Sequence, residues 1–355
     1  MNRFNGVVSP SEKDALLQEA YLPAFHPNDN HAANLLELDN GDLLCVWFSG
    51  SGEGNPDTNV VMSRLPAGSS QWSEPIQLSG DPERSEQNPV LFQADNGSLW
   101  LFHTSNEPHN QRTSKIVYRV SEDQGITWGA AEVLSGGPGI FLRHPPLVLQ
   151  NGDWLLPAYY CKLEGHYSVV LISSNQGATW HEYEVPGSTH RVQMNVVELQ
   201  DGTLYAMFRS RQADRIYTSI SHDNGKSWSV PAKSDLPNNN SSMQLITLQN
   251  GHLALIYNNS TMERDQFRWV QRKGEFRKKP LRTPLTVSIS EDQGKTWPHF
   301  RNVQMADLEY KDSEIGYSYP SIIAARDGSI HLAFSYLRKG IKYVRLPEQW
   351  IKEWQ

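Results

Sequence analysis

Polar and ionisable residues stand directly before a series of apolar segments in this chain. In chain order these stretches read NHAAN, SEQNP, FLRHPP, HRVQMN, NNNSSM and GYSYP. The arginine guanidinium is suited to binding carboxylates, because it is planar, always charged and donates two parallel hydrogen bonds. Histidine and tyrosine side chains can transfer protons. The candidate residues in these stretches are His31, Asn88, Arg143, His144, Gln193, Tyr317 and Tyr319.

The segments that follow share one pattern, which PVLFQADNGSLWLFH illustrates: an apolar run, a turn that contains glycine, and a second apolar run. Asn-Gly or Asp-Gly between such runs is a strong signal for a β-hairpin. The turn glycines are 56, 55, 50, 49 and 77 residues apart, which indicates six repeats of one structural unit. They are Gly41, Gly97, Gly152, Gly202, Gly251 and Gly328.

A second repeat is offset from the first. It reads SEDQGITW from Ser121, SSNQGATW from Ser173, SHDNGKSW from Ser221 and SEDQGKTW from Ser290, with a degraded copy over residues 63–72. The Asp or Asn at its third position can bond to the amides of its own loop, and the glycine supplies a positive φ. The tryptophan can bury its ring beneath the turn. We interpret these boxes as structural staples without a catalytic role.

Together the two repeats predict an all-β, six-bladed β-propeller over residues 1–355 as a single domain. Each unit supplies a hairpin, a third strand that enters the box and a fourth strand that leaves it. The sixth unit lacks a box, so we expect the N-terminal segment, about residues 1–25, to complete the last blade. The long fifth interval holds a highly charged insertion, residues 260–284, which we expect to form a loop beside the site.

The bulk composition argues against several classes of partner. The net charge is −7, the pI is near 5.9 and no lysine-rich run occurs, so neither nucleic acid nor an anionic membrane is an expected partner. The start lacks an apolar leader and no long apolar run follows, so we expect a soluble, cytoplasmic protein. Cys45 and Cys161 lie in apolar runs and are expected to be buried thiols. The histidines show no local metal-ligand spacing, and we expect no metal or cofactor.

The box S-x-D-x-G-x-[ST]-W is the Asp-box, and a six-bladed propeller with several copies resembles the sialidase (neuraminidase) superfamily along essentially the whole chain. The motifs HAAN, EGNPD, RHPP and YSYP also resemble a branch of bacterial and plant Asp-box, or BNR-repeat, proteins that are described as sialidase-like. The boxes are specific for the architecture and only weakly specific for the chemistry.

The resemblance implies a tyrosine nucleophile paired with a glutamate, an acidic residue as general acid/base, and three arginines that bind the substrate carboxylate. Tyr317 matches the nucleophile by its place in IGYSYP, and Tyr319, two residues on, is the alternative that could face the channel. Arg282 matches one arginine of the family. Arg215 matches a second, with Arg209 as the alternative.

Two positions depart from the family pattern. His31 stands where sialidases have their first arginine, and Gln193 stands where the glutamate partner of the tyrosine is expected. The first change removes one carboxylate ligand, and the second removes the base that would activate the nucleophile.

The acid/base residue is expected in the glycine-rich loop WFSGSGEGNPDTNVVMS, where Glu53 and Asp57 are the candidates. Partial burial could raise the pKa of such a carboxyl and let it donate a proton near neutral pH. Arg143 and Arg338 are the candidates to replace the missing arginine, and His144 accompanies Arg143 at the channel mouth.

The predicted function is therefore an exo-acting glycoside hydrolase that releases a terminal acidic sugar, sialic acid or a related ulosonic or uronic acid. One alternative is a polysaccharide lyase in which histidine and tyrosine catalyse β-elimination from a uronate whose carboxylate an arginine neutralises. The other is a non-catalytic carbohydrate-binding propeller. In each case the partner is a carbohydrate with an acidic sugar.

Overall fold

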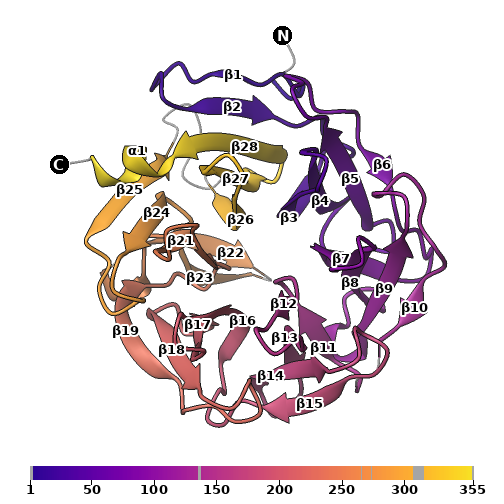
Figure 1. Ribbon diagram of the computed structural model, residues 1–355, viewed down its shortest axis with the longest axis vertical. Helices are drawn as coiled ribbons and strands as arrows, with labels where there is room; N and C mark the ends of the chain where they lie inside the picture. The colour runs from indigo at the N-terminus through magenta and orange to yellow at the C-terminus, as the bar shows by residue number, and fades with distance from the viewer. Residues whose placement is uncertain (1–2, 135–136, 265, 273, 307–315, 354–355) are drawn as a thin grey trace.

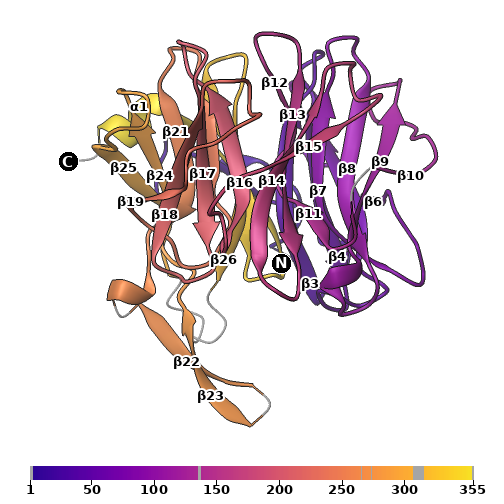
Figure 2. The ribbon, with the colours of Figure 1, turned by 90° about the horizontal axis from the view of Figure 1, so that it is seen from below.

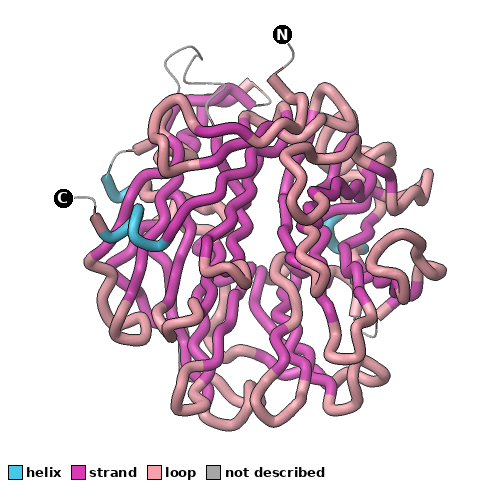
Figure 3. Tube along the Cα trace, turned by 45° about the horizontal axis from the view of Figure 1, so that its top comes forward, coloured by secondary structure: helices cyan, strands magenta, loops and turns pink. Residues whose placement is uncertain are grey.

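Among the described residues, the regular secondary structure is almost entirely β-strand, as Figure 3 shows by colour. The computed structural model describes residues 3–134, 137–264, 266–272, 274–306 and 316–353. In this part of the chain, six sheets are arranged around a central axis and form the predicted six-bladed β-propeller (Figure 1). Among the residues described, no helix is long and apolar enough to cross a membrane.

Each blade is an antiparallel sheet whose first strand lies nearest the axis. The first two blades are β3 (Asp29–Glu37), β4 (Leu43–Gly50), β5 (Asn59–Leu65) and β6 (Ile76–Gln77), then β7 (Ser85–Gln93), β8 (Leu99–Asn106), β9 (Lys115–Ser121) and β10 (Glu132–Val133). The third is β11 (Ile140–Leu142), β12 (Leu147–Val148), β13 (Trp154–Cys161), β14 (His166–Ser173) and β15 (His181–Glu184). The fourth is β16 (Arg191–Glu198), β17 (Leu204–Ser210), β18 (Arg215–Ser221) and β19 (Ala232–Pro237).

The fifth blade contains an insertion and the sixth joins the two ends of the chain. The fifth is β20 (Gln244–Thr247), β21 (Leu253–Asn258), β24 (Leu285–Ser290) and β25 (His299–Gln304), with β22 (Phe267–Arg272) and β23 (Glu275–Pro280) inserted between β21 and β24. The sixth is β26 (Tyr317–Ala324), β27 (Ser329–Tyr336) and β28 (Gly340–Pro347), with β1 (Ser9–Pro10) and β2 (Gln18–Tyr21) on its outer edge. A short helix, α1 (Glu348–Lys352), follows.

The sixth blade therefore takes its outer strands from the N-terminal segment. Strand β2 pairs antiparallel with β28, in a register that sets Glu19 opposite Val344. The carboxylate of Glu19 also forms an ion pair at 3.0 Å with the buried ammonium of Lys342. This pairing joins the two ends of the chain and leaves β28 without an open edge on that side.

The Asp-boxes form the predicted staples. The side chain of Asp223 accepts hydrogen bonds from the amide and the hydroxyl of Ser227, at 2.8 and 2.6 Å. Gly225 has a φ of +85°, as the turn requires. The boxes lie at the ends of the third strands, which is the end of the propeller opposite to the starts of the inner strands.

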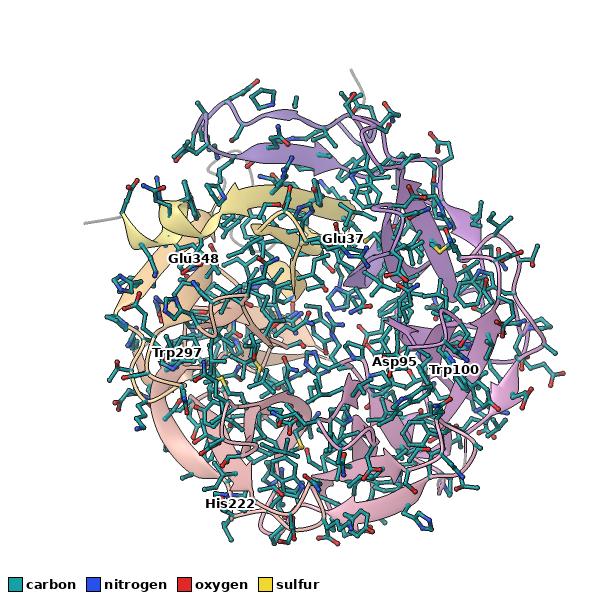
Figure 4. All side chains as sticks on the ribbon, viewed as in Figure 1. Glu37, Asp95, Trp100, His222, Trp297 and Glu348 are labelled. Carbon is teal, nitrogen blue, oxygen red and sulfur yellow. The ribbon has the colours of Figure 1, made fainter. Side chains whose placement is uncertain are left out.

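The core lies between neighbouring blades rather than in one centre. One apolar cluster combines residues of blades two and three, and another combines residues of blades five and six. Aromatic rings bridge the sheets, since Trp100 of blade two contacts Trp154 of blade three edge to face at 5.5 Å. Figure 4 shows side chains, the labelled Trp100 and Trp297 among them, filling the spaces between blades. Both cysteines are buried free thiols, as predicted.

Two parts of the chain differ from the regular pattern. The inner strand of blade three is split into β11 and β12, because Pro145 and Pro146 cannot donate ladder hydrogen bonds. The insertion of residues 260–284, which we predicted to be a loop, contains the β22–β23 hairpin, and this hairpin projects from the propeller (Figure 2).

Candidate active site

Four inner strands carry the same irregularity near their first residues. The pairing of each with the second strand of its blade shifts register, as at a β-bulge. A non-glycine residue with positive φ lies at or next to each bulge, and backbone strain of this kind is often concentrated at functional sites. These residues are Ala32 (+62°), Asn88 (+50°), Gln193 (+51°) and Tyr319 (+53°).

The bulge on β26 decides which tyrosine enters the site. In a regular strand Tyr317 and Tyr319 would point to the same face. The bulge between Ser318 and Ser321 breaks this alternation. Tyr317 is 0% exposed and packs in the apolar cluster between blades five and six. The Tyr319 hydroxyl instead accepts a hydrogen bond from Arg209. The structure therefore places Tyr317 in the core, contrary to its prediction as the nucleophile, and places the alternative, Tyr319, in the site.

The Tyr319 hydroxyl lies in a hydrogen-bonded group with Arg209 and Gln193. Arg209 donates from Nη1 to the tyrosine oxygen at 2.6 Å and to Gln193 Oε1 at 2.9 Å. Gln193 donates from Nε2 to the same tyrosine oxygen at 3.2 Å. Gln193 thus contacts the tyrosine from the position at which the family glutamate was expected. Its amide is neutral, however, and cannot serve as a base.

Arg209, rather than Arg215, is the arginine of blade four at this site. Arg209 is the second-last residue of β17, and its Nε donates to the side-chain oxygen of Asn240 at 2.9 Å. Arg215 begins the next strand and bonds to Glu263 at 2.7 Å and to the carbonyl of Asp235, so it belongs to a separate polar cluster. The structure therefore places Arg215 outside the site, contrary to its prediction as a substrate-binding residue.

Arg143 and His31 lie beneath the tyrosine ring. Arg143 is 1% exposed and donates from Nη2 to the carbonyls of Ala33, Tyr319 and Pro320, so it ties blade three to blades one and six. The His31 ring lies 4.3 Å from the Tyr319 ring, and its Nδ1 is 2.7 Å from the hydroxyl of Ser335. Neither side chain reaches solvent, which contradicts direct substrate binding by Arg143 and favours a supporting role for both.

His144 is also buried beside this group, and both ring nitrogens lack a hydrogen-bond partner among the described residues. Burial, reinforced by Arg143, holds the pKa of His144 well below its usual value. Burial and the surrounding arginines do the same for the pKa of His31. Both imidazoles are therefore neutral, and His144 is too deeply buried to bind substrate as predicted.

Arg282 and Arg338 face the site from blades five and six, and both are partly exposed. Arg282 donates to the hydroxyl of Ser318 at 3.2 Å. Arg338 Nη1 bonds to both oxygens of Asp29, at 2.9 and 2.8 Å, and its Nη2 bonds to Glu53. Of the two arginines predicted to replace the missing one, Arg338 is partly exposed to solvent, whereas Arg143 is buried. Sequence reasoning missed Asp29, although it stands two residues before His31.

Glu53 and Asp57 have different roles in their loop. Asp57 accepts hydrogen bonds from the amide and the hydroxyl of Ser51, at 3.1 and 2.8 Å, so its carboxylate closes the loop. Glu53 instead reaches the arginines. Burial alone would raise the pKa of Glu53, but Arg338, followed by Arg282 and Arg209, outweighs it, and the pKa lies below its usual value. The expected rise in the pKa of this carboxyl is therefore contradicted.

The same cations act on the tyrosine. Burial and the nearby Glu53 would raise the pKa of the Tyr319 phenol, but Arg209, helped by Arg282, holds it below its usual value. The guanidinium carbons of Arg209 and Arg282 lie 5.7 and 5.6 Å from the centre of the tyrosine ring. Cations at this distance favour the anionic form of the phenol.

A cleft of about 760 Å³ opens beside Glu53, between blades one, two and three. Its wall is rich in groups that bond to hydroxyls. The side-chain amide oxygen (Oδ1) of the buried Asn106 has no hydrogen-bond partner among the described residues. Asn88, predicted to bind substrate, lies next to the cleft residue Gln87 and is itself 6% exposed. The polar side chains of the wall include Gln87, Asn106, His109, Asn110, Gln111 and His166.

The family of the chain follows from its sequence. The BNR repeat-like domain family matches residues 41–332, which is most of the chain. The chain belongs to the BNR repeat-like domain family. No curated protein sequence is significantly similar to it.

Solved structures share the fold of this BNR repeat-like protein at low sequence identity. A Hadza microbial sialidase superimposes with a TM-score of 0.74 and 14% identity over 91% of this chain and 66% of the sialidase, just under two thirds. A protein of unknown function from Dyadobacter fermentans gives 0.73 and 14%, over 94% and 99% of the two chains. The intramolecular trans-sialidase from Ruminococcus gnavus gives 0.72 and 14%, over 92% and 96%. These likenesses confirm a sialidase-like propeller and extend to the fold alone.

Proposed function

We propose that this protein is a glycoside hydrolase that releases a terminal acidic sugar from a glycan, with Tyr319 as its nucleophile. One observation carries the proposal. Arg209 and Arg282 converge on the tyrosine, and among the described residues no salt bridge joins either of them to a carboxylate. Guanidinium groups that are largely removed from water and lack a counter-ion favour binding of an anion.

The charge of Arg282 supports this reading. Burial and the neighbouring cations lower its pKa to about 10, because both make its charged form less favourable. A substrate carboxylate between Arg209 and Arg282 would relieve this repulsion, and the planar guanidinium groups suit it. Arg338 already has two carboxylate partners, Asp29 and Glu53, so its role in this proposal is to orient Glu53.

The reaction then proceeds in two displacements. The ionised Tyr319 oxygen attacks the anomeric carbon as the bond from that carbon to the leaving oxygen breaks, and the protonated Glu53 gives its proton to the leaving oxygen. A water molecule next attacks the same carbon, Glu53 takes a proton from it, and the tyrosine oxygen leaves. Binding of an anionic substrate weakens the cationic field on Glu53, so its pKa rises when it must act as an acid.

The test compares Tyr319→Phe with Tyr317→Phe, which removes a hydroxyl two residues away in the core. Fluorogenic glycosides of sialic acid, of its deaminated analogue and of uronic acids serve as substrates. We expect Tyr319→Phe to lower fluorophore release at least about a thousandfold, while Tyr317→Phe keeps nearly full activity. Equal activity of the two variants would refute Tyr319 as the nucleophile.

A second function, β-elimination from a uronate, draws support from the contact between His31 and Tyr319. In that reaction the ionised Tyr319 oxygen takes the C5 proton, the bond from C4 to its oxygen breaks, and Glu53 protonates the leaving oxygen. The buried position of His31 makes it a support of the tyrosine rather than a partner that reaches the substrate. An unsaturated product with near-ultraviolet absorbance would decide for the lyase.

A further inference from the structure

The hairpin of β22 and β23 projects from the end of the propeller that carries the candidate active site (Figure 2). It joins β21 to β24, and Arg282 follows it directly in the chain. The backbone amide of Tyr317 bonds to the carbonyl of Arg282, so the base of the hairpin adjoins the strand that carries Tyr319.

The register of the hairpin separates two faces. Phe267, Trp269 and Phe276 fall on one face with Lys278, because Trp269 pairs with Lys278 and side chains alternate along each strand. The Lys278 ammonium lies 4.0 Å from the centre of the Phe267 ring and 5.7 Å from that of Trp269. Trp269 is 61% exposed and Phe276 is 69% exposed. This face offers aromatic surfaces beside a cation.

The opposite face is cationic and continues the field of the active site. Arg268, Arg277 and Lys279 fall on this face. Glu275, which forms an ion pair with Arg277 at 2.7 Å, is its only acidic residue among those described. Burial, together with Arg282, Arg268 and Arg338, lowers the pKa of Lys279 to about 8. The cations of the hairpin therefore meet those of the site at Lys279.

We propose that this hairpin is a binding arm for a polyanionic glycan, which it holds while the terminal sugar of the chain occupies the active site. Exposed aromatic rings provide platforms for sugar rings, and arginine and lysine bind their carboxylate or sulfate groups. A strand of six residues extends about 20 Å, so the arm can contact several sugars. The overall charge of −7 makes the positive arm distinctive within the protein. The link to the terminal sugar rests on the proposed function, whereas glycan binding by the arm does not.

The experiment measures binding of polygalacturonate to the full chain, with Tyr319→Phe as the background so that turnover plays no part. The hairpin variant carries Arg277→Gln and Lys278→Gln, which leave Lys279 at the site intact. The matched control carries Lys226→Gln and Lys295→Gln, two exposed lysines of Asp-boxes at the opposite end of the propeller. A third variant, Trp269→Ala, tests the aromatic face, and neutral dextran tests the need for charge.

We expect the hairpin variant to bind polygalacturonate about tenfold more weakly, with a smaller dependence on salt, and the control to bind it unchanged. Trp269→Ala should weaken binding as well, and dextran should not bind. Equal affinity of the hairpin variant and the control would overturn the proposal. So would loss of self-association, seen by light scattering, with unchanged polysaccharide binding, because the arm would then join copies of the chain. If no small glycoside is cleaved but the hairpin effect holds, the proposed function fails and the binding arm stands.

Discussion

Removal of the Arg209 cation should raise the pKa of Tyr319. The bond from Arg209 Nη1 to the tyrosine oxygen is 2.6 Å long and has a charged donor. Hydrogen bonds to charged groups contribute about 1.5–3 kcal/mol. Arg209→Gln should therefore raise the pKa of Tyr319, and the rise is limited because Arg282 and Arg143 remain beside the ring.

The assay is a pH titration of tyrosinate absorbance in the ultraviolet. The chain has 14 tyrosines, so the Tyr319 signal is the difference between a protein with this residue and the same protein with Tyr319→Phe. Arg215→Gln is the matched control, because it removes an equal charge from a neighbouring strand without touching the tyrosine. Arg209→Lys keeps the cation and should shift the titration less.

The same change should appear in catalysis. The ionised tyrosine becomes more abundant as the pH rises through its pKa, so the rising limb of kcat/KM against pH should move to higher pH in Arg209→Gln, in step with the tyrosine titration. An unchanged Tyr319 titration in Arg209→Gln, or an equal shift in Arg215→Gln, would refute the view that this cation replaces the missing glutamate.

Three further predictions concern the acid, the folded state and the staples. Glu53→Gln should lower release from a sugar leaving group by about 10²–10⁴-fold, but much less from an acidic phenol, which needs no proton. Burial, with Arg345 adding to it, lowers the pKa of His331 to about 4, so below pH 6.5 the unfolded chain binds a proton that the folded chain does not. Between pH 7 and pH 5 the free energy of unfolding, measured with urea, should therefore fall by about 2 kcal/mol less in His331→Gln than in the wild type. Asp223→Ala should cost about 1–2 kcal/mol of stability in the same assay and leave activity unchanged.

Each of these has a clear contrary result. Equal losses for both leaving groups in Glu53→Gln would remove this residue from the acid role. A His331→Gln protein that weakens in acid as much as the wild type would show that other groups cause the acid sensitivity. Loss of activity at full stability in Asp223→Ala would mean that an Asp-box does more than hold its turn.

The architecture could be predicted from the sequence because its determinants are local. A hairpin turn needs Gly41 and its five counterparts at positive φ, and an Asp-box closes through bonds between residues four apart, as from Asp223 to Ser227. Side-chain alternation identifies the strands between them. Such signals recur along the chain, so their number and spacing indicate the six blades.

The composition of the site was also partly visible in the sequence, because its residues precede the inner strands. Their orientations were not. A bulge shifts the alternation by one step, so that Tyr317 lies in the core and Tyr319 in the site, and no local signal marks this bulge. Arg143 carries the right group, yet packing of three blades buries it beneath the tyrosine.

The electrostatics of the site depend on the closure of the six blades into a ring. Asp29 and Arg338 are 309 residues apart in the chain and meet because blades one and six are neighbours. Arg209, Arg282 and Arg338 likewise come from three blades, and together they lower the pKa of Glu53 rather than raise it. The pKa of a group depends on every charge and desolvating surface around it, so it is set by tertiary structure even where each residue type can be read from the sequence.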